Sequence, residues 1–304
     1  MDCVLKTFGL TKKYKKQLAV NEADMTINRG DIYGFVGENG SGKTTIIRLI
    51  TGLIFASSGS LELFGVRNNS EKIKEARRKV GAVVESPSIY QNMSAYENLK
   101  MQCMILGIPA DERIKETLNE VGLGELYDDK KQVGNFSLGM RQRLGIAMAL
   151  MGEPEFLILD EPMNGLDPAG IVEIRELILK LNREKNITFL ISSHILSELS
   201  LVATKYGIIS KGHIIKEITA GDLQEEMRKT TDITADNPER LFEVVSGFTD
   251  KKVSYIPNGV RIAGEINLNE ILGAVIKNDV HIISVNCKES SFEDYYLETI
   301  GGRR

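Results

Sequence analysis

The residues from position 37 to position 44 have the types and the spacing of a phosphate-binding loop. Two glycines stand five positions apart, and a lysine and a threonine follow the second glycine. Glycines let successive backbone amides turn toward phosphate oxygens, the lysine meets the outer phosphates, and the threonine hydroxyl binds the accompanying Mg²⁺. The residues predicted to bind the phosphates are Gly37, Glu38, Asn39, Gly40, Ser41, Gly42, Lys43, Thr44 and Thr45. The loop therefore predicts that the chain binds a nucleoside triphosphate.

The sequence on either side of this loop fits the same interpretation. The apolar residues 32–36 predict a buried strand that leads into the loop, and residues 45–50 predict a helix that leads out of it. A helix start adds unpaired amides and the positive end of the helix dipole at the same place. A glycine-rich turn without a ligand is the alternative, but the complete spacing and both flanks favour the phosphate site.

A second pair of chemically useful residues follows the apolar run 156–159. This run predicts a buried strand, which would deliver Asp160 and Glu161 to the edge of the sheet where α/β proteins bind their ligands. Neighbouring positions on a strand point in different directions, so the two acids can take different roles. We expect Asp160 to hold magnesium through water and Glu161 to orient or deprotonate an attacking water molecule. An acidic cap on the next loop would explain the pair alone, but not its occurrence beside a phosphate loop.

A third segment, residues 135–144, places Ser137 and Gly139 ahead of an apolar helix that we expect over residues 144–151. A serine at a helix start is a common N-cap, and that role alone would explain Ser137. The free amides of a helix start could equally bind a γ-phosphate presented by another subunit. Taken in isolation, the segment favours capping.

The composition limits the kinds of protein that this chain can be. The 304 residues carry 38 basic and 42 acidic side chains, a net charge of −4, which argues against a surface built mainly to grip nucleic acid. The three cysteines, Cys3, Cys103 and Cys287, show no metal-like or redox-pair spacing, which fits a reducing cytoplasm. No apolar run reaches the length that crosses a bilayer, and the N-terminus lacks a signal-peptide pattern. A membrane span would have to come from another chain.

The order of the predicted elements indicates an α/β core followed by a smaller unit. Short alternating runs before residue 31 predict antiparallel strands, and residues 61–65 predict an edge strand. Helical spacing prevails from about residue 92 to residue 151, and strands typical of a parallel sheet return after it. Beyond a polar linker at 221–229, further strands and helices predict a small α+β unit without a recognisable chemical motif.

Taken in order, these segments resemble the ATPase subunit of ABC transporters over about residues 1–220. The resemblance rests on the phosphate loop, a signature at residues 136–140, the strand-end acids, a D-loop at residues 164–167 and a histidine that follows a strand. It implies an α/β fold of the P-loop ABC ATPase type, with a mixed sheet core, an antiparallel β subdomain and a helical subdomain at about 88–151. Residues 221–304 would form a small C-terminal α+β accessory domain, and the cofactors would be ATP and Mg²⁺.

The resemblance also implies roles for individual residues. Tyr14 would stack on adenine, and Ser137 and Gly139 would close on ATP held by a second copy of the chain. Asp167 would link the two sites, and His194 would contact the γ-phosphate, although a histidine at a strand end needs no such role by itself. The residues assigned to catalysis are Glu161, His194, Lys43 and Glu85, and those assigned to the metal are Thr44, Glu85 and Asp160.

Two positions depart from the usual pattern of the family. Glu85 stands at a strand end where the family usually has glutamine, so it adds a negative charge and loses an amide donor, although magnesium accepts a carboxylate. The same glutamate is familiar in the ATPases of bacitracin-type and lantibiotic self-protection exporters, and residues 85–90 look similar to that group. The signature Phe136-Ser137-Leu138-Gly139-Met140 keeps the serine and the second glycine of the usual Leu-Ser-Gly-Gly-Gln.

The sequence therefore predicts the ATP-hydrolysing subunit of an ABC transporter, which powers a separate transmembrane permease and expels antimicrobial peptides or drugs. Two copies would close head-to-tail around two ATP molecules. The chain would be cytoplasmic and peripheral on the inner face of the membrane through its permease, with no nucleic-acid partner. An importer ATPase and a soluble non-transport ABC ATPase are the alternatives. The C-terminal unit would assist dimerisation or cover an exposed sheet edge.

Overall fold

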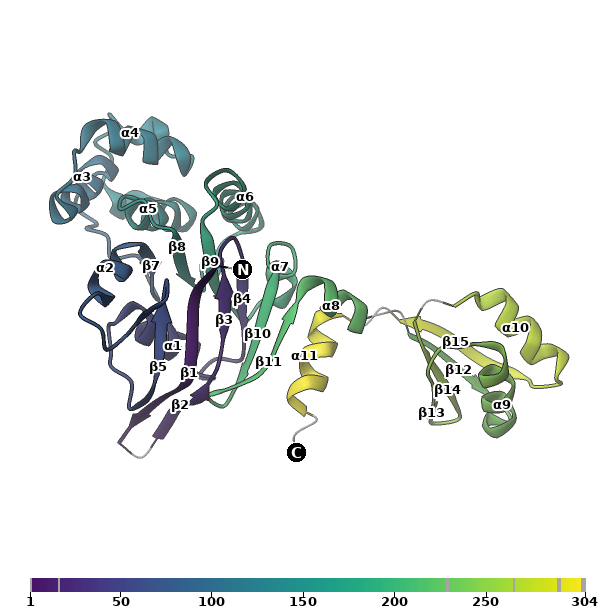
Figure 1. The fold of residues 1–304 in the computed structure, drawn as a ribbon. Helices are drawn as coiled ribbons and strands as arrows, with labels where there is room; N and C mark the ends of the chain where they lie inside the picture. The colour runs from purple at the N-terminus through teal and green to yellow at the C-terminus, as the bar shows by residue number, and fades with distance from the viewer. Residues whose placement is uncertain (1, 16, 228–229, 265, 289–290, 302–304) are drawn as a thin grey trace. The chain divides into compact units, whose positions relative to one another are not determined.

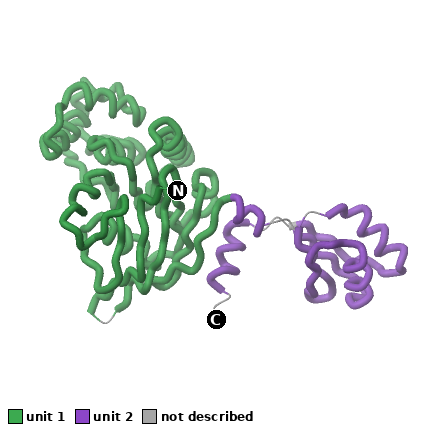
Figure 2. The backbone as a smooth tube through the Cα atoms, viewed as in Figure 1, with its two compact units in different colours: residues 1–220 green, residues 221–304 purple. Residues whose placement is uncertain are grey.

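The chain folds into two compact units, which comprise residues 1–220 and residues 221–304 (Figure 2). The computed structural model describes them over residues 2–15, 17–227, 230–264, 266–288 and 291–301. No helix within these described ranges has the length and apolar character that crossing a membrane requires.

A six-stranded, largely parallel sheet forms the centre of the first unit (Figure 1). From one edge to the other, its strands are β11 (His213–Thr219), β10 (Lys205–Ser210), β4 (Ile32–Val36), β9 (Thr188–Ser193), β8 (Phe156–Asp160) and β7 (Val80–Val83). All neighbours are parallel except β10 and β11, which form a hairpin. Every residue of β4, β8 and β9 is buried, as expected for parallel strands covered on both faces. The carboxyl ends of these three strands therefore lie together at one edge of the sheet.

A second, antiparallel sheet contains the N-terminal strands. Its order is β2 (Gln17–Ala23), β1 (Cys3–Tyr14), β5 (Ser58–Leu63) and β6 (Val66–Arg67), and β3 (Thr26–Asn28) also pairs with β1. The predicted antiparallel strands before residue 31 are confirmed. The prediction of an edge strand at 61–65 is wrong, because β5 lies between β1 and β6. Phe64 and Gly65 have positive φ and turn the chain, so that it returns as β6 along the far side of β5.

The two sheets share one hydrophobic core. Leu5 and Leu63 of the antiparallel sheet are fully buried in the same cluster as Phe35 and Ile158 of the parallel sheet and Ile47 of helix α1 (Lys43–Thr51). Burying an apolar side chain of this size contributes about 1.5–3 kcal/mol. The core therefore fixes α1, which begins at the phosphate loop, against the edge where β4 and β8 end.

The remaining helices of the first unit range from three to 18 residues in length, and three of them form a helical group (Figure 1). The remaining helices are α2 (Ile73–Arg78), α3 (Ala95–Leu106), α4 (Asp111–Glu120), η1 (Gly124–Leu126), η2 (Val133–Asn135), α5 (Leu138–Leu150), α6 (Pro168–Lys185) and α7 (Leu196–Leu199). The helical group is α3, α4 and α5, and a capping box of Ser94 and Glu97 begins α3. The sequence predicts an apolar helix over residues 144–151. Helix α5 instead begins at Leu138, because Ser137 caps it there.

The second unit has the βαββαβ order of a ferredoxin-like fold. Its elements are α8 (Ala220–Glu226), β12 (Thr230–Ala235), α9 (Pro238–Phe248), β13 (Val253–Ile256), β14 (Gly259–Ala263), α10 (Leu268–Lys277), β15 (Ile282–Lys288) and α11 (Phe292–Gly301). The antiparallel sheet has the order β13-β14-β12-β15, and residues of α9 and α10 share its buried core. The predicted α+β character is confirmed. Helix α11 was missed, because only Phe292, Tyr295 and Tyr296 mark its buried face.

Ion pairs join the start of β8 to neighbouring segments of the first unit. The Glu155 carboxylate lies 2.8 Å from Lys79 Nζ and 2.7 Å from Arg29 Nη1. Hydrogen bonds from Lys79 first, and then from Arg29, hold the pKa of the Glu155 carboxyl below its ordinary value. A depressed folded-state pKa stabilises the protein above the unfolded-state pKa of about 4.3, and this stabilisation is lost as the pH falls through the folded-state pKa.

We expect Glu155→Gln to lower the free energy of unfolding at neutral pH by at most about 1 kcal/mol, because the pairs are partly exposed. The difference from the wild type should shrink in acid, where Glu155 is protonated in both states. Urea unfolding at neutral pH and below the folded-state pKa measures both values, with Glu153→Gln, a more exposed acid near Arg113, as the control. A difference that stays the same at both pH values would contradict the prediction.

Candidate active site

The phosphate loop connects β4 to α1, and close packing explains its glycines. A Cβ on Gly37 would lie 2.6 Å from both the Ile209 carbonyl oxygen and Ser41 Oγ. A Cβ on Gly42, which has φ +114°, would lie 2.7 Å from the Ala19 carbonyl oxygen. Gly42 is the N-cap of α1 and provides no side chain to bond the first amides of the helix. These amides are therefore free to bind an anion at the loop.

The exposure of the loop residues separates an outer part from an inner part. Glu38, Asn39 and Gly40 are exposed, whereas Thr44 and Thr45 are half-buried. Ser41 is 6% exposed, and its Oγ is a buried polar atom without a hydrogen-bond partner in the described structure. An unpartnered buried hydroxyl costs free energy, and a ligand oxygen at the loop would supply the missing partner.

The ammonium group of Lys43 lies inside the loop. Lys43 is 5% exposed, and its Nζ donates to the carbonyl oxygens of Gly37 at 2.5 Å and Glu38 at 3.2 Å. The same Nζ lies 3.5 Å from Glu161 Oε1. A buried cation needs such partners, and phosphate oxygens at this loop would be stronger ones.

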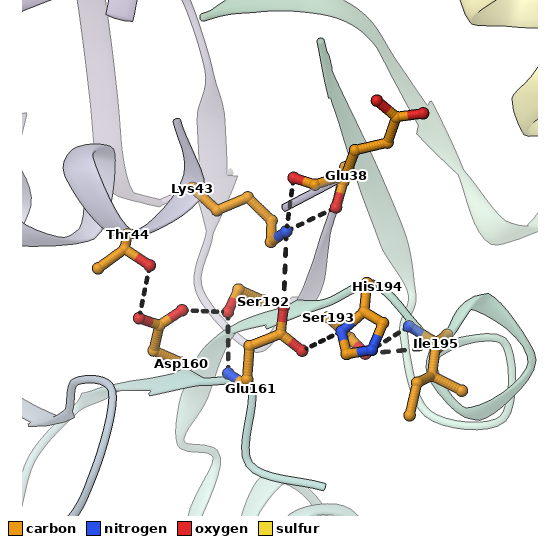
Figure 3. A network of polar contacts seen from close by, with 10 residues as sticks. Glu38, Lys43, Thr44, Asp160, Glu161, Ser192, Ser193, His194 and Ile195 are labelled. Carbon is orange, nitrogen blue, oxygen red and sulfur yellow. Dashed lines mark hydrogen bonds and ion pairs between the residues drawn. The ribbon is translucent and has the colours of Figure 1, made fainter. Parts of the chain in front are cut away.

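A hydroxyl and a carboxylate meet where α1 begins and β8 ends (Figure 3). Thr44 Oγ1 donates to Asp160 Oδ2 at 2.9 Å, and Ser192 Oγ donates to Asp160 Oδ1 at 2.5 Å. Asp160 is 2% exposed and stands opposite Ser192 in the parallel pairing of β8 with β9. Ser192 is not among the residues predicted for the site. It lies near the end of the apolar strand β9, two positions before His194, but only the order of the strands shows that it reaches Asp160.

Glu161 and His194 face each other beside this group (Figure 3). His194 Nδ1 lies 2.7 Å from Glu161 Oε2, and because an ionised carboxylate only accepts hydrogen bonds, Nδ1 carries the hydrogen. The amide of Glu161 donates to Ser192 Oγ at 2.9 Å, and Glu161 has φ +51°, so its side chain turns away from that of Asp160 toward Lys43. Glu161 Oε1 is buried and has no hydrogen-bond partner in the described structure.

Glu85 lies at the end of β7 but does not join this network. Its Oε1 lies 2.5 Å from Arg48 Nη2 on α1, and its side chain is 60% exposed. Glu85 was expected to share a metal with Thr44 and Asp160. Instead its carboxylate pairs with Arg48, a residue that sequence analysis did not consider because the partners are 37 positions apart.

The other predicted residues have local partners of their own. Tyr14 ends β1, is 41% exposed and has Lys12 Nζ at 5.1 Å from its ring centroid. Ser137 Oγ accepts from the Met140 amide at 3.1 Å, so the predicted N-cap is confirmed. Asp167 caps α6 in the same way, accepting from Gly170. Gly139 lies in the first turn of α5, where a Cβ would approach no described side chain closer than 3.9 Å.

The donor set limits which metal the site could hold. The described residues contain no group of three or more His, Cys, Asp or Glu side chains that could enclose a metal ion. Thr44 and Asp160 offer only oxygen atoms. This set fits Mg²⁺, which keeps several water ligands and takes the rest from one or two carboxylates and from substrate phosphates.

Comparison with known proteins gives independent information about the chain. A family model described as ABC transporter matches residues 20–164. Over 99% of both chains, the sequence is 42% identical to the bacitracin transport ATP-binding protein BcrA of Bacillus licheniformis. It is 44% identical to the lantibiotic transport ATP-binding protein SrtF of Streptococcus pyogenes, over 226 residues that cover 74% of this chain and 95% of that relative.

A solved structure also resembles this fold. CbiO1 of Clostridium perfringens, part of the ABC transporter complex cbiONQ, is 29% identical with a TM-score of 0.67. The match covers 73% of this chain and 91% of CbiO1. The similarity to BcrA thus extends over both units, whereas the shorter matches to SrtF and CbiO1 have about the extent of the first unit alone.

Proposed function

The chain belongs to the ABC transporter ATP-binding proteins and is an ATPase, and we propose that it powers a separate membrane-spanning permease that exports antimicrobial peptides. The observation that carries this proposal is the network in which Lys43, Thr44, Asp160, Glu161 and His194 meet at one edge of the parallel sheet. The cargo class rests on the 42% identity to a bacitracin transport protein over 99% of both chains. The likeness to a lantibiotic transport protein supports the same class.

The phosphate loop and Lys43 bind the triphosphate of ATP. The loop amides and the start of α1 supply neutral donors, and Lys43 supplies a charge that moves from the Gly37 carbonyl to the outer phosphates. Thr44 Oγ1 and Asp160, which meet at 2.9 Å, would hold Mg²⁺, with Asp160 expected to act through water. When bound, the ion would supply positive charge that offsets the charge of the phosphates. Ser192 fixes the Asp160 carboxylate through its other oxygen.

Glu161 is the residue that orients or deprotonates the attacking water. Its Oε1 is buried and has no hydrogen-bond partner among the described residues, so this oxygen is available to accept a hydrogen from water. Its Oε2 is held by His194 Nδ1, which fixes the direction of the carboxylate. The Nε2 edge of His194 then contacts the γ-phosphate.

A second copy of the chain completes each site. Ser137 is exposed at the start of α5, and Gly139 leaves the surface there without a side chain. In a head-to-tail pair, this helix start lies on the γ-phosphate bound by the other copy, where its amides and dipole favour an anion. Asp167 connects the two sites, and Tyr14, whose ring is 41% exposed, stacks on adenine.

The two units have different roles in this proposal. Residues 1–220 are the ATP-binding domain, with the helical subdomain at about 88–151, and residues 221–304 are an accessory domain. The 226 residues matched in SrtF make up 95% of that relative, which leaves no room there for a unit of this size. The ATPase core therefore does not depend on the accessory domain, for which we propose a role in dimerisation. The chain acts on the cytoplasmic face of the membrane through its permease.

We expect the tagged chain, purified from detergent-solubilised membranes of its own host, to carry a membrane protein with several spanning helices. In proteoliposomes containing this complex, bacitracin or a lantibiotic should stimulate ATP hydrolysis, whereas a soluble peptide of similar size should not. A complex whose ATPase rate is unchanged by either antibiotic would contradict the cargo class. Purification without any membrane protein would contradict the transport role.

A further inference from the structure

Glu85 and Arg48 form an ion pair that joins the end of β7 to α1. Glu85 Oε1 lies 2.5 Å from Arg48 Nη2, and the two side chains are 60% and 37% exposed. Glu85 has φ +61°, in the left-handed region that residues with a side chain adopt rarely. The backbone amide of the next residue, Ser86, donates to the Val84 carbonyl oxygen at 2.8 Å, and this hydrogen bond closes a tight turn around Glu85. The backbone and the ion pair therefore both determine where the carboxylate of Glu85 lies.

The pair lies close to the proposed magnesium ligands. Arg48 follows Thr44 by four positions on α1, so the two side chains leave the same face of the helix about 5–6 Å apart. β7 pairs with β8 in parallel, at a strand spacing of about 4.8 Å, and its last pair is Val83 opposite Leu159. Val84 is therefore level with Asp160, and Glu85 follows one position further, just beyond the end of β7. Glu85 thus follows the strand beside the one that carries Asp160, and its carboxylate is bonded to Arg48 on the helix that carries Thr44.

A free carboxylate at this position would change the electrostatics of the nucleotide site. Asp160 and Glu161 already place two carboxylates there, and a third would repel the phosphates of ATP and attract a divalent cation. An arginine bonded to Glu85 offsets both effects. A glutamine in the same position would be neutral and would need no such partner.

We propose that Arg48 is a positioning residue, which holds Glu85 away from the magnesium ligands and neutralises its charge. This inference rests on the proposed function, because it concerns the same ATP site. Arg48 and Mg²⁺ then compete for one carboxylate, and Glu85 reaches the cation only when the ion pair opens. The competition makes the binding of ATP less dependent on Mg²⁺ than it would be with an unrestrained Glu85.

The test measures nucleotide binding without hydrolysis. The full-length chain is titrated calorimetrically with the non-hydrolysable analogue AMPPNP, in excess Mg²⁺ and in EDTA, and the ratio of the two dissociation constants is compared between variants. The ratio is the dissociation constant in EDTA divided by that in excess Mg²⁺. We expect Arg48→Met to raise this ratio about fivefold, which corresponds to the largest interaction energy typical of a partly exposed ion pair. Arg48→Lys, which keeps the charge, should stay close to the wild type.

Two further variants identify the cause of any change. In the Glu85→Gln background, Arg48→Met should leave the ratio unchanged, because no carboxylate remains for Arg48 to hold. Arg48 and Glu85 line a cavity of about 880 Å³, and the exposed Arg78 lines it too. The variant Arg78→Met should have the same ratio of dissociation constants as the wild type. If Arg48→Met unfolds the chain in a thermal melt, Arg48→Gln takes its place.

The outcomes separate this inference from the proposed function. An unchanged ratio in Arg48→Met, or an equal change in the Glu85→Gln background, would overturn the role of Arg48 while the wild type still binds the nucleotide with Mg²⁺. A wild type that binds no AMPPNP under either condition would instead overturn the ATP site itself.

Discussion

Replacing Glu161 by glutamine should lower ATP turnover at least about a hundredfold and leave ATP binding intact. The substitution keeps the shape of the side chain and its contact with His194. It removes the basic carboxylate oxygen that is buried beside Lys43 and that no described residue hydrogen-bonds. Phosphate release under saturating Mg·ATP measures turnover, and calorimetric titration with ATP measures binding.

A matched control isolates this effect. Glu176→Gln makes the same chemical change on α6, where the carboxylate is 68% exposed, and it should not alter turnover. If Glu161→Gln hydrolysed ATP at the wild-type rate, Glu161 would not be the residue that activates water. The acid at the end of β8 would then have only a structural role toward His194 and Lys43.

Replacing Gly139 by aspartate should also lower the rate of ATP hydrolysis at least about a hundredfold. This effect is expected although Gly139 contacts none of the described residues of the Lys43–Glu161 network. An aspartate at the start of α5 would place a negative charge against the γ-phosphate bound by the other copy. The fold should tolerate the change, because a Cβ there meets no described side chain closer than 3.9 Å. An acid in the first turn is also favourable for the helix dipole.

The control for this variant is Gly273→Asp, which changes a helical glycine of α10. Apart from the adjoining residues and backbone of its own helix, no described atom lies within 4 Å of a Cβ added there. It should retain the wild-type ATPase rate. Binding of ATP to the Gly139→Asp monomer should persist, since the residue completes only the partner's site. Normal hydrolysis by Gly139→Asp would show that the start of α5 does not face nucleotide.

The phosphate loop was predictable because the residues that bind the phosphates are consecutive in the sequence. Gly37, Gly42, Lys43 and Thr44 need only the strand before them and the helix after them, and local apolar patterns indicate both. Asp160 and Glu161 were found for the same reason, at the end of the apolar strand β8. What each of these side chains bonds to depended on which strands lie side by side.

The site residues that were not predicted, Ser192 and Arg48, depend on contacts between distant segments. Ser192 reaches Asp160 only because β9 lies next to β8, and Arg48 meets Glu85 only because α1 begins at the edge of the sheet where β7 ends. The same limit applied to topology. The prediction for 61–65 found a strand but not its two neighbours, and alternation after residue 230 indicated an α+β unit but not the order β13-β14-β12-β15.

The most direct measurement is the mass of the Glu161→Gln chain in solution, determined by light scattering with Mg·ATP and with Mg·ADP. With ATP the mass should be twice the 33.8 kDa of one chain, because each copy closes on the nucleotide of the other and hydrolysis cannot reopen the pair. With ADP, or with Gly139→Asp added, it should be that of a single chain. A single-chain mass in saturating Mg·ATP, with ATP bound, would contradict a site completed by a second copy.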